Sequence, residues 1–197
     1  MRGTRIELLG AMFEERVVAK SRRAVETRSG RTAAEIFAAN ERVNQLLLAR
    51  LDPAAWRAKP VDGVRTIAAI VTHVHNVRAK WVRLNAPQVG VPAQLKWASC
   101  TQEEARVGLT ESAARCEEML ALVAGGGVKE FLRDGWAAAW PLGIGAVGME
   151  MVCYMVAHEA HHRGQICMLA HQMGFQLPKD VMYGMWNWER LWGLALR

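Results

Sequence analysis

The residues best suited to chemistry lie in one short stretch, His158–Gln165, with the sequence HEAHHRGQ. It contains three of the six histidines of the chain within five positions, and Glu159 stands beside the first of them. On a helix, His158 and His162 lie one turn apart on the same side, with Cβ atoms roughly 6 Å from each other. This spacing suits two ligands on one metal ion.

The sequence around this stretch has helical periodicity. At about 100° per residue, His162 falls in the same stripe as His158, and His161 lies on the edge of that stripe. Arg163 and His171 project away from it. A stripe that carries two histidines at its centre predicts the inner face of a bundle helix, where buried imidazoles need partners. The other residues within about 40° of His158 are mostly apolar: Val147, Met151, Tyr154, Gln165 and Leu169.

A third metal ligand has to come from another helix, and His73 and His75 are the candidates. The apolar stripe of their helix contains Ile67, Ile70, Val71, Val74, Val77 and Trp81. The two histidines flank that stripe on opposite sides, each about 100° from its centre, so periodicity does not choose between them. A three-histidine set with an open position is a catalytic type of site for zinc or another borderline transition metal, with room for water or a thiolate. The alternative is that these histidines are only hydrogen-bonded.

The same stretch also matches the zinc-protease pattern HExxH, in which Glu159 would be the general base. The extended form of that pattern requires glycine and histidine where this chain has Gln165 and Met168. Glu189 is a possible third ligand in this alternative. We expect no sheet edge that could bind a peptide substrate, which counts against a protease.

Composition predicts an all-α fold in one domain, because strand-like alternation of β-branched residues is nearly absent over the 197 residues. Capping pairs, Thr followed three residues later by Glu, mark three helix starts. We expect a four-helix bundle in which a long irregular connection precedes the last bundle helix. The expected helices cover residues 5–25, 32–51, 65–84, 102–123, 146–173 and a short Trp-rich C-terminal helix over 182–194.

The net charge of +6 belongs mostly to an N-terminal arm. Residues 1–31 contain eight Lys or Arg against four Glu. The body, residues 32–197, therefore carries only a small excess of positive charge. Nothing in the body resembles a nucleic-acid recognition motif, so we expect no nucleic-acid partner. We expect the arm to be a helix with a basic face exposed to solvent.

The four cysteines, Cys100, Cys116, Cys153 and Cys167, form no CxxC pair, and no signal peptide is apparent. We therefore expect free thiols and a cytoplasmic protein. Residues 135–157 contain a single charge and could be scored as a membrane span, but Pro141 and four glycines interrupt the stretch. We expect no membrane partner.

The order of the helices and their motifs resembles the DinB-like superfamily over residues 32–194. The resemblance is carried by the segment Arg65–Val74 with Trp81 after it, by the HRGQ-containing stretch and by the closing Trp-rich helix. It implies a four-helix bundle that holds a divalent metal, often nickel or zinc, by three histidines, and frequently a homodimer. The histidine that precedes an aliphatic residue and stands eight positions before Trp81 is His73.

Carried over position by position, the resemblance implies His73, His158 and His162 as metal ligands. It also implies a small-molecule substrate, because characterised relatives include S-transferases that use low-molecular-weight thiols such as bacillithiol or mycothiol. A metal-dependent thiol transferase or hydrolase is therefore our main hypothesis. A non-catalytic helical interaction or stress protein is the alternative. Glu159 is the candidate catalytic residue, although it lies about 100° from His158 and either orients a ligand or faces solvent.

Overall fold

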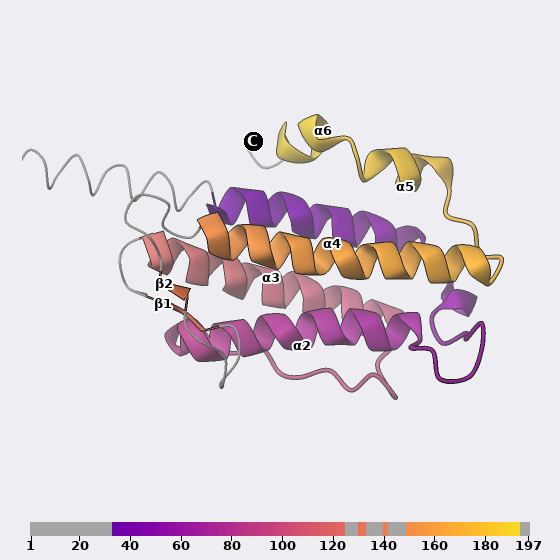
Figure 1. Cartoon of the computed structure of the whole chain (residues 1–197), viewed down its shortest axis with the longest axis horizontal. Coiled ribbons are helices and arrows are strands. Elements are labelled where there is room, and N and C mark those ends of the chain that lie inside the picture. The colour runs from indigo at the N-terminus through magenta and orange to yellow at the C-terminus, as the bar shows by residue number, and fades with distance from the viewer. Residues whose placement is uncertain (1–32, 125–129, 133–139, 142–148, 194–197) are drawn as a thin grey trace, which may run out of the picture.

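Four long helices form the body of the computed structural model, which describes residues 33–124, 130–132, 140–141 and 149–193 (Figure 1). The first covers residues 33–50, and the others are α2 (Ile67–Asn85), α3 (Gln102–Ala124) and α4 (Met149–Gln172). The prediction of an all-α four-helix bundle is confirmed. Shorter elements connect or follow them: η1 (Pro53–Ala55), η2 (Pro87–Val89), β1 (Glu130–Phe131), β2 (Trp140–Pro141), α5 (Lys179–Gly184) and α6 (Trp188–Gly193).

The bundle contains one parallel pair of consecutive helices. The helix 33–50 and α4 run in one direction and α2 and α3 in the other, so the connection over residues 86–101 returns along the length of the bundle (Figure 1). This long connection lies against α2. It forms part of the surroundings of the candidate site.

Local hydrogen bonds explain where the bundle helices begin and end. Thr66 caps α2, since its hydroxyl oxygen accepts from the Ala69 amide at 3.1 Å. Thr101 and Glu104 form the predicted capping box at the start of α3, with reciprocal bonds of 2.8 and 3.1 Å. Gly174 ends α4 as predicted, because it adopts φ +84°, a left-handed conformation that favours glycine.

The core consists of two apolar halves with a polar layer between them. One half is built around Trp56, Ile67 and Ile166, and the other around Phe37, Trp81 and Met151. Each long helix contributes to both halves and places buried polar side chains at its middle. Such a layer is costly unless its members are hydrogen-bonded to one another. Its members include Asn40, Glu41, Asn44, Arg78, Ser112, Glu159 and His162.

Two sequence-based expectations differ from the structure. The C-terminal helix predicted over 182–194 is two short helices, α5 and α6, separated by a turn. The connection before α4 was expected to contain at most a helical turn, but β1 pairs with β2 in an antiparallel ladder of two residues each. The predicted helix 5–25 lies outside the described residues.

Residues 135–157, considered above as a membrane span, do not form one helix, because β2 lies within them and α4 begins at Met149. None of the helices in the described ranges combines the length and apolar character needed to cross a membrane. All four cysteines lie in the described ranges and are free, as predicted.

Candidate metal centre

Three histidines from two helices converge at one place in the bundle. His73 comes from α2, and His158 and His162 come from successive turns of α4. The ring centroids lie 5.6 Å (His73–His158), 4.9 Å (His73–His162) and 4.6 Å (His158–His162) apart. One nitrogen from each ring lies within 4.8 Å of the others. The three imidazoles are therefore close enough to share one metal ion.

Gln165 fixes the orientation of His162. Its side-chain oxygen lies 2.8 Å from His162 Nδ1, and its amide nitrogen lies 3.0 Å from His161 Nε2. When Gln165 accepts from Nδ1–H, the lone pair of the neutral ring stands on Nε2. A hydrogen bond to the second ring nitrogen is how metal-binding histidines are commonly held in the ligating tautomer. Gln165, the glutamine of the HRGQ stretch, thus orients His162, which lies one turn earlier on the helix.

The surroundings of the three rings lower their pKa values and so favour the neutral form. Burial, together with the neighbouring His162 and His73, lowers the pKa of His158 to about 4. Burial is also the main cause that lowers the pKa of His73 and of His162. The positive charge of Arg65 acts on both of these rings in the same direction. Neutral imidazoles carry the lone pairs that a metal ion requires.

The donor set fits a divalent transition metal. Zinc–nitrogen bonds of about 2.0–2.1 Å in a tetrahedral site place the ligand nitrogens about 3.3 Å apart. The ligand nitrogens of the three histidines lie within 4.8 Å of one another in the structure. His158 Nδ1 is buried without a hydrogen-bond partner. Such an atom costs about 1–3 kcal/mol when it is left unsatisfied, and a metal ion is one group that could relieve that cost.

An aromatic wall and an open pocket flank the three histidines. Trp81, which is buried in α2, packs edge to face against His158 with ring centroids 5.4 Å apart. On another side, His73 lines a pocket of about 450 Å³ that also includes Arg65 and Trp97. Of the three histidines, His73 alone borders this pocket, and His158 packs against Trp81.

His75, the other candidate on α2, is used for packing instead. Its side chain is buried, and its two ring nitrogens lie 2.9 Å from the Gly108 carbonyl oxygen and 2.8 Å from the Ala93 carbonyl oxygen. It therefore ties α2 to α3 and to the connection 86–101. Both ring nitrogens already have partners, and the ring does not belong to the three-histidine cluster.

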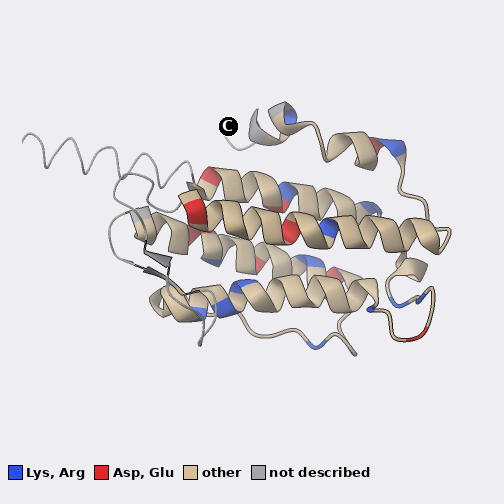
Figure 2. Ribbon diagram, in the orientation of Figure 1, with Lys and Arg blue, Asp and Glu red and all other residues tan. Residues whose placement is uncertain are grey.

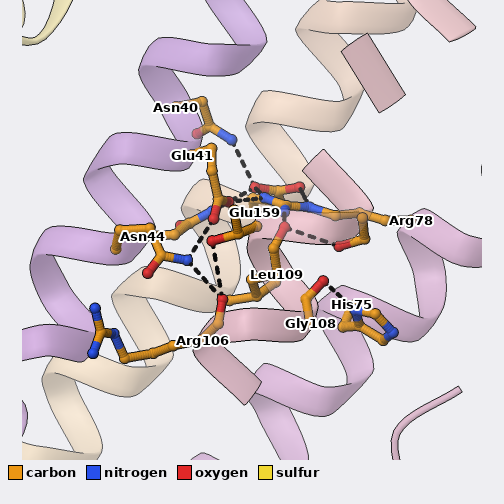
Figure 3. Close-up of polar contacts among 12 residues, drawn as sticks. Asn40, Glu41, Asn44, His75, Arg78, Arg106, Gly108, Leu109 and Glu159 are labelled. Atoms are coloured by element: carbon orange, nitrogen blue, oxygen red, sulfur yellow. Dashed lines mark hydrogen bonds and ion pairs between the residues drawn. The ribbon is translucent and has the colours of Figure 1, made fainter. Parts of the chain in front are cut away.

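Glu159 points into the polar layer of the core (Figure 3). Its carboxylate accepts two hydrogen bonds from Arg78, both 2.7 Å long, and one each from Asn40 (2.6 Å) and Asn44 (2.8 Å). Burial alone would raise the pKa of Glu159, but the charge and hydrogen bonds of Arg78 bring it below its usual value. Three of these four hydrogen bonds reach Oε2 and one reaches Oε1, so both carboxylate oxygens are engaged inside the core.

Arg78 is the centre of this network. It is fully buried, and it also donates to Glu41 at 2.7 Å and to the Leu109 carbonyl oxygen at 2.8 Å. Its guanidinium group lies over the ring of Phe37, 5.0 Å from the centroid. The network links α2, α3, α4 and the helix 33–50, so it fixes the positions of the helices that carry the three histidines.

The other predicted residues are placed as follows. Arg163 donates to the side-chain oxygens of Asn40 and Asn44, at 2.6 and 2.9 Å, and so connects α4 to the helix 33–50. His171 is exposed in the last turn of α4. The side chain of Glu189 lies outside what the structure describes. Sequence reasoning missed Arg78, although it stands one turn after Val74 of the apolar stripe, where a cation requires a buried partner.

Comparison with known proteins identifies the family. The sequence profile of the DinB family matches residues 26–190, which is most of the 197-residue chain. No curated protein and no solved structure matches the sequence. The extent of the family match, together with the four-helix bundle, shows that this chain is a member of the DinB family.

Proposed function

We propose that His73, His158 and His162 bind one divalent transition metal ion, zinc or nickel, and that the protein is a metal-dependent thiol S-transferase or hydrolase. The observation that carries the proposal is that one ring nitrogen from each of the three histidines lies within 4.8 Å of the others. The lowered pKa of each ring supports it, because the neutral imidazole is the metal-binding form. His73 also borders an open pocket, which supports an enzyme over a closed structural metal site.

The protein's own side chains would hold and orient the metal and admit the substrate. A divalent metal bound by three neutral imidazoles keeps its full charge and lowers the pKa of a thiol or water beside it. Gln165 would keep Nε2 of His162 available, and Trp81 would exclude water on the His158 side. In the transfer reaction the thiolate sulfur bonds to an electrophilic carbon, and the leaving group departs with the bonding electron pair.

For Glu159 we propose a positioning role. As a general base it would need an oxygen directed at a metal-bound water, but its carboxylate is engaged by Arg78, Asn40 and Asn44 inside the core. The two-residue ladder of β1 and β2 offers little edge for binding an extended peptide. Both observations favour small-molecule chemistry over the HExxH protease.

The enzyme proposal is tested by turnover. The zinc- or nickel-loaded chain is incubated with a panel of low-molecular-weight thiols and an aromatic or epoxide electrophile, and thiol consumption is followed. We expect turnover that is abolished by a chelator and in His162→Ala. His171→Ala is the matched control, because it removes an exposed histidine of the same helix, and it should retain full turnover.

Two results would contradict the enzyme proposal. Turnover unchanged by the chelator would show that the reaction does not use the metal. Stoichiometric metal without consumption of any thiol, and without hydrolysis of ester or amide substrates, would favour the non-catalytic alternative.

We further propose that the protein is a homodimer, as the family resemblance implies. Large apolar side chains are exposed on and directly after α5, namely Met182 (52 %), Tyr183 (73 %) and Trp186 (80 %). Exposed apolar groups of this size are typical of interfaces. Light scattering on the purified protein should give twice the mass of 21.9 kDa, and a monomeric mass at micromolar concentration would contradict the proposal.

A further inference from the structure

The pocket beside His73 has two protein walls. Its floor is the first half of α2, including Thr72 and His73. One wall is the segment that leads into α2, with Lys59 and Arg65, and the other contains Trp97 from the connection 86–101. The volume, about 450 Å³, suits a small organic molecule.

The wall that carries Trp97 is fastened to α2. Asn76 donates to the Leu95 carbonyl oxygen and accepts from the Leu95 amide, both at 2.9 Å. His75 holds Ala93, and Arg57 donates to the Trp97 carbonyl oxygen at 3.0 Å. The indole itself is 57 % exposed. An exposed aromatic side chain on a fixed segment is well suited to pack against a ligand.

The neutral polar side chains of the pocket are already engaged. Thr66 caps α2 and Thr72 donates to the Ala68 carbonyl oxygen. Asn76 uses both ends of its amide on Leu95. The groups that remain for a ligand, apart from His73, are thus the two cations and the face of Trp97.

The charge of the pocket is positive. No Asp or Glu lines it, and within the described ranges neither Lys59 nor Arg65 forms an ion pair. Both side chains are exposed, so an incoming ligand can reach them. The segment before α2 shows blue cationic positions near the start of that helix (Figure 2). A guanidinium without a carboxylate partner can donate two hydrogen bonds to an oxyanion and binds it strongly.

We propose that this pocket is the substrate subsite for a small organic anion. Its carboxylate or phosphate group binds Arg65, with Lys59 as a second cation, and its apolar or planar body packs on Trp97, beside the His73 side of the centre. The inference rests on the proposed function only in making the anion a substrate or cosubstrate of that centre. Arg65 is then a specificity-determining residue.

The test compares charged and neutral probes of one shape. Benzoate, phenyl phosphate and the neutral benzamide are titrated by calorimetry into the full chain, once metal-loaded and once treated with a chelator. We expect the anions to bind at least about tenfold more tightly than benzamide, because a charge-assisted hydrogen bond contributes at least that factor. Benzoate and phenyl phosphate together tell whether a carboxylate or a phosphate is preferred.

Arg65→Gln should lower the affinity for the anions about tenfold and leave benzamide unchanged. The matched control is Arg83→Gln, which removes the same charge from an exposed site in the last turn of α2, roughly 24 Å along the helix from its start. Its affinity for the anions should change less than about twofold, since screening weakens charge effects beyond about 10 Å. Circular dichroism verifies that both variants are folded.

Titrating both the metal-loaded and the chelator-treated protein separates this inference from the proposed function. Arg65-dependent binding of an anion in the chelator-treated protein supports the subsite even if no metal activity is found. Anion binding that needs the metal and is unchanged in Arg65→Gln would overturn it, because the anion would then be a ligand of the metal alone. Equal affinity for benzoate, phenyl phosphate and benzamide would also overturn it.

Discussion

Replacing Glu159 with alanine would remove four hydrogen bonds from the polar layer of the core. Two come from Arg78, one from Asn40 and one from Asn44. Arg78, which is 0 % exposed, would keep only the carboxylate of Glu41 and the Leu109 carbonyl oxygen. Breaking one partner of a buried ion pair costs about 3–5 kcal/mol, because a buried charge loses its compensation.

This loss is large compared with the total stability of a typical domain, about 5–15 kcal/mol. We expect Glu159→Ala to lower the free energy of unfolding by about 3–5 kcal/mol, measured by urea unfolding in a chelator with circular dichroism and tryptophan fluorescence. If the alanine variant does not fold, Glu159→Gln provides a milder change of the same kind. In a double-mutant cycle with Arg78→Ala, the two losses should add to more than the loss in the double variant.

Glu118→Ala is the matched control. Glu118 accepts from Arg115 at 2.8 Å, but the two side chains are 49 % and 39 % exposed. A solvent-exposed ion pair of this kind contributes less than about 1 kcal/mol. If Glu159→Ala cost no more than Glu118→Ala, the argument that the polar layer depends on this carboxylate would be refuted.

Three further predictions concern α2 and α4. His75→Ala should lower the free energy of unfolding by about 1–3 kcal/mol, since it removes the buried hydrogen bonding that ties α2 to Gly108 and Ala93. Metal stoichiometry should stay unchanged, and loss of metal would contradict the packing role. Gly164→Ala should raise the free energy of unfolding in urea by about 0.5–1 kcal/mol, because Gly164 is an exposed helical position where an added Cβ meets no atom within 4 Å. A lower free energy of unfolding would contradict this prediction. The free energy of unfolding of the metal-free protein should fall from pH 7 to pH 5, because the pKa of His158 is 6.5 in the unfolded chain and about 4 in the fold, so the unfolded state binds more protons in this window. His158→Phe should weaken this pH dependence. An equal slope of unfolding free energy against pH in both proteins would contradict the assignment.

The positions of the bundle helices could be predicted from local signals. The capping box at Thr101 and the glycine stop at Gly174 depend only on nearby backbone atoms, and both occur as predicted. The break between α5 and α6 also has a local signal, but the sequence-based prediction missed it. There Asn187 accepts from the Arg190 amide at 3.1 Å and restarts the helix after a turn.

The choice between His73 and His75 could not come from periodicity, because both flank the apolar stripe of α2. The structure separates them through contacts far apart in the sequence. His75 meets Gly108 and Ala93, whereas His73 meets His158 and His162. For the same reason the environment of Glu159 was left open: its partners Arg78 and Asn40 are 81 and 119 positions away.

Metal content tests the central claim most directly. The protein, without a histidine tag, is incubated with zinc or nickel and desalted. Plasma mass spectrometry then gives the metal content of the wild type, of His73→Ala, His158→Ala and His162→Ala, and of the control His171→Ala. We predict about one metal ion per chain in the wild type and in the control, and a loss of most of it in the other three variants. Equal metal content in all five proteins, or none in the wild type, would contradict the proposed three-histidine centre.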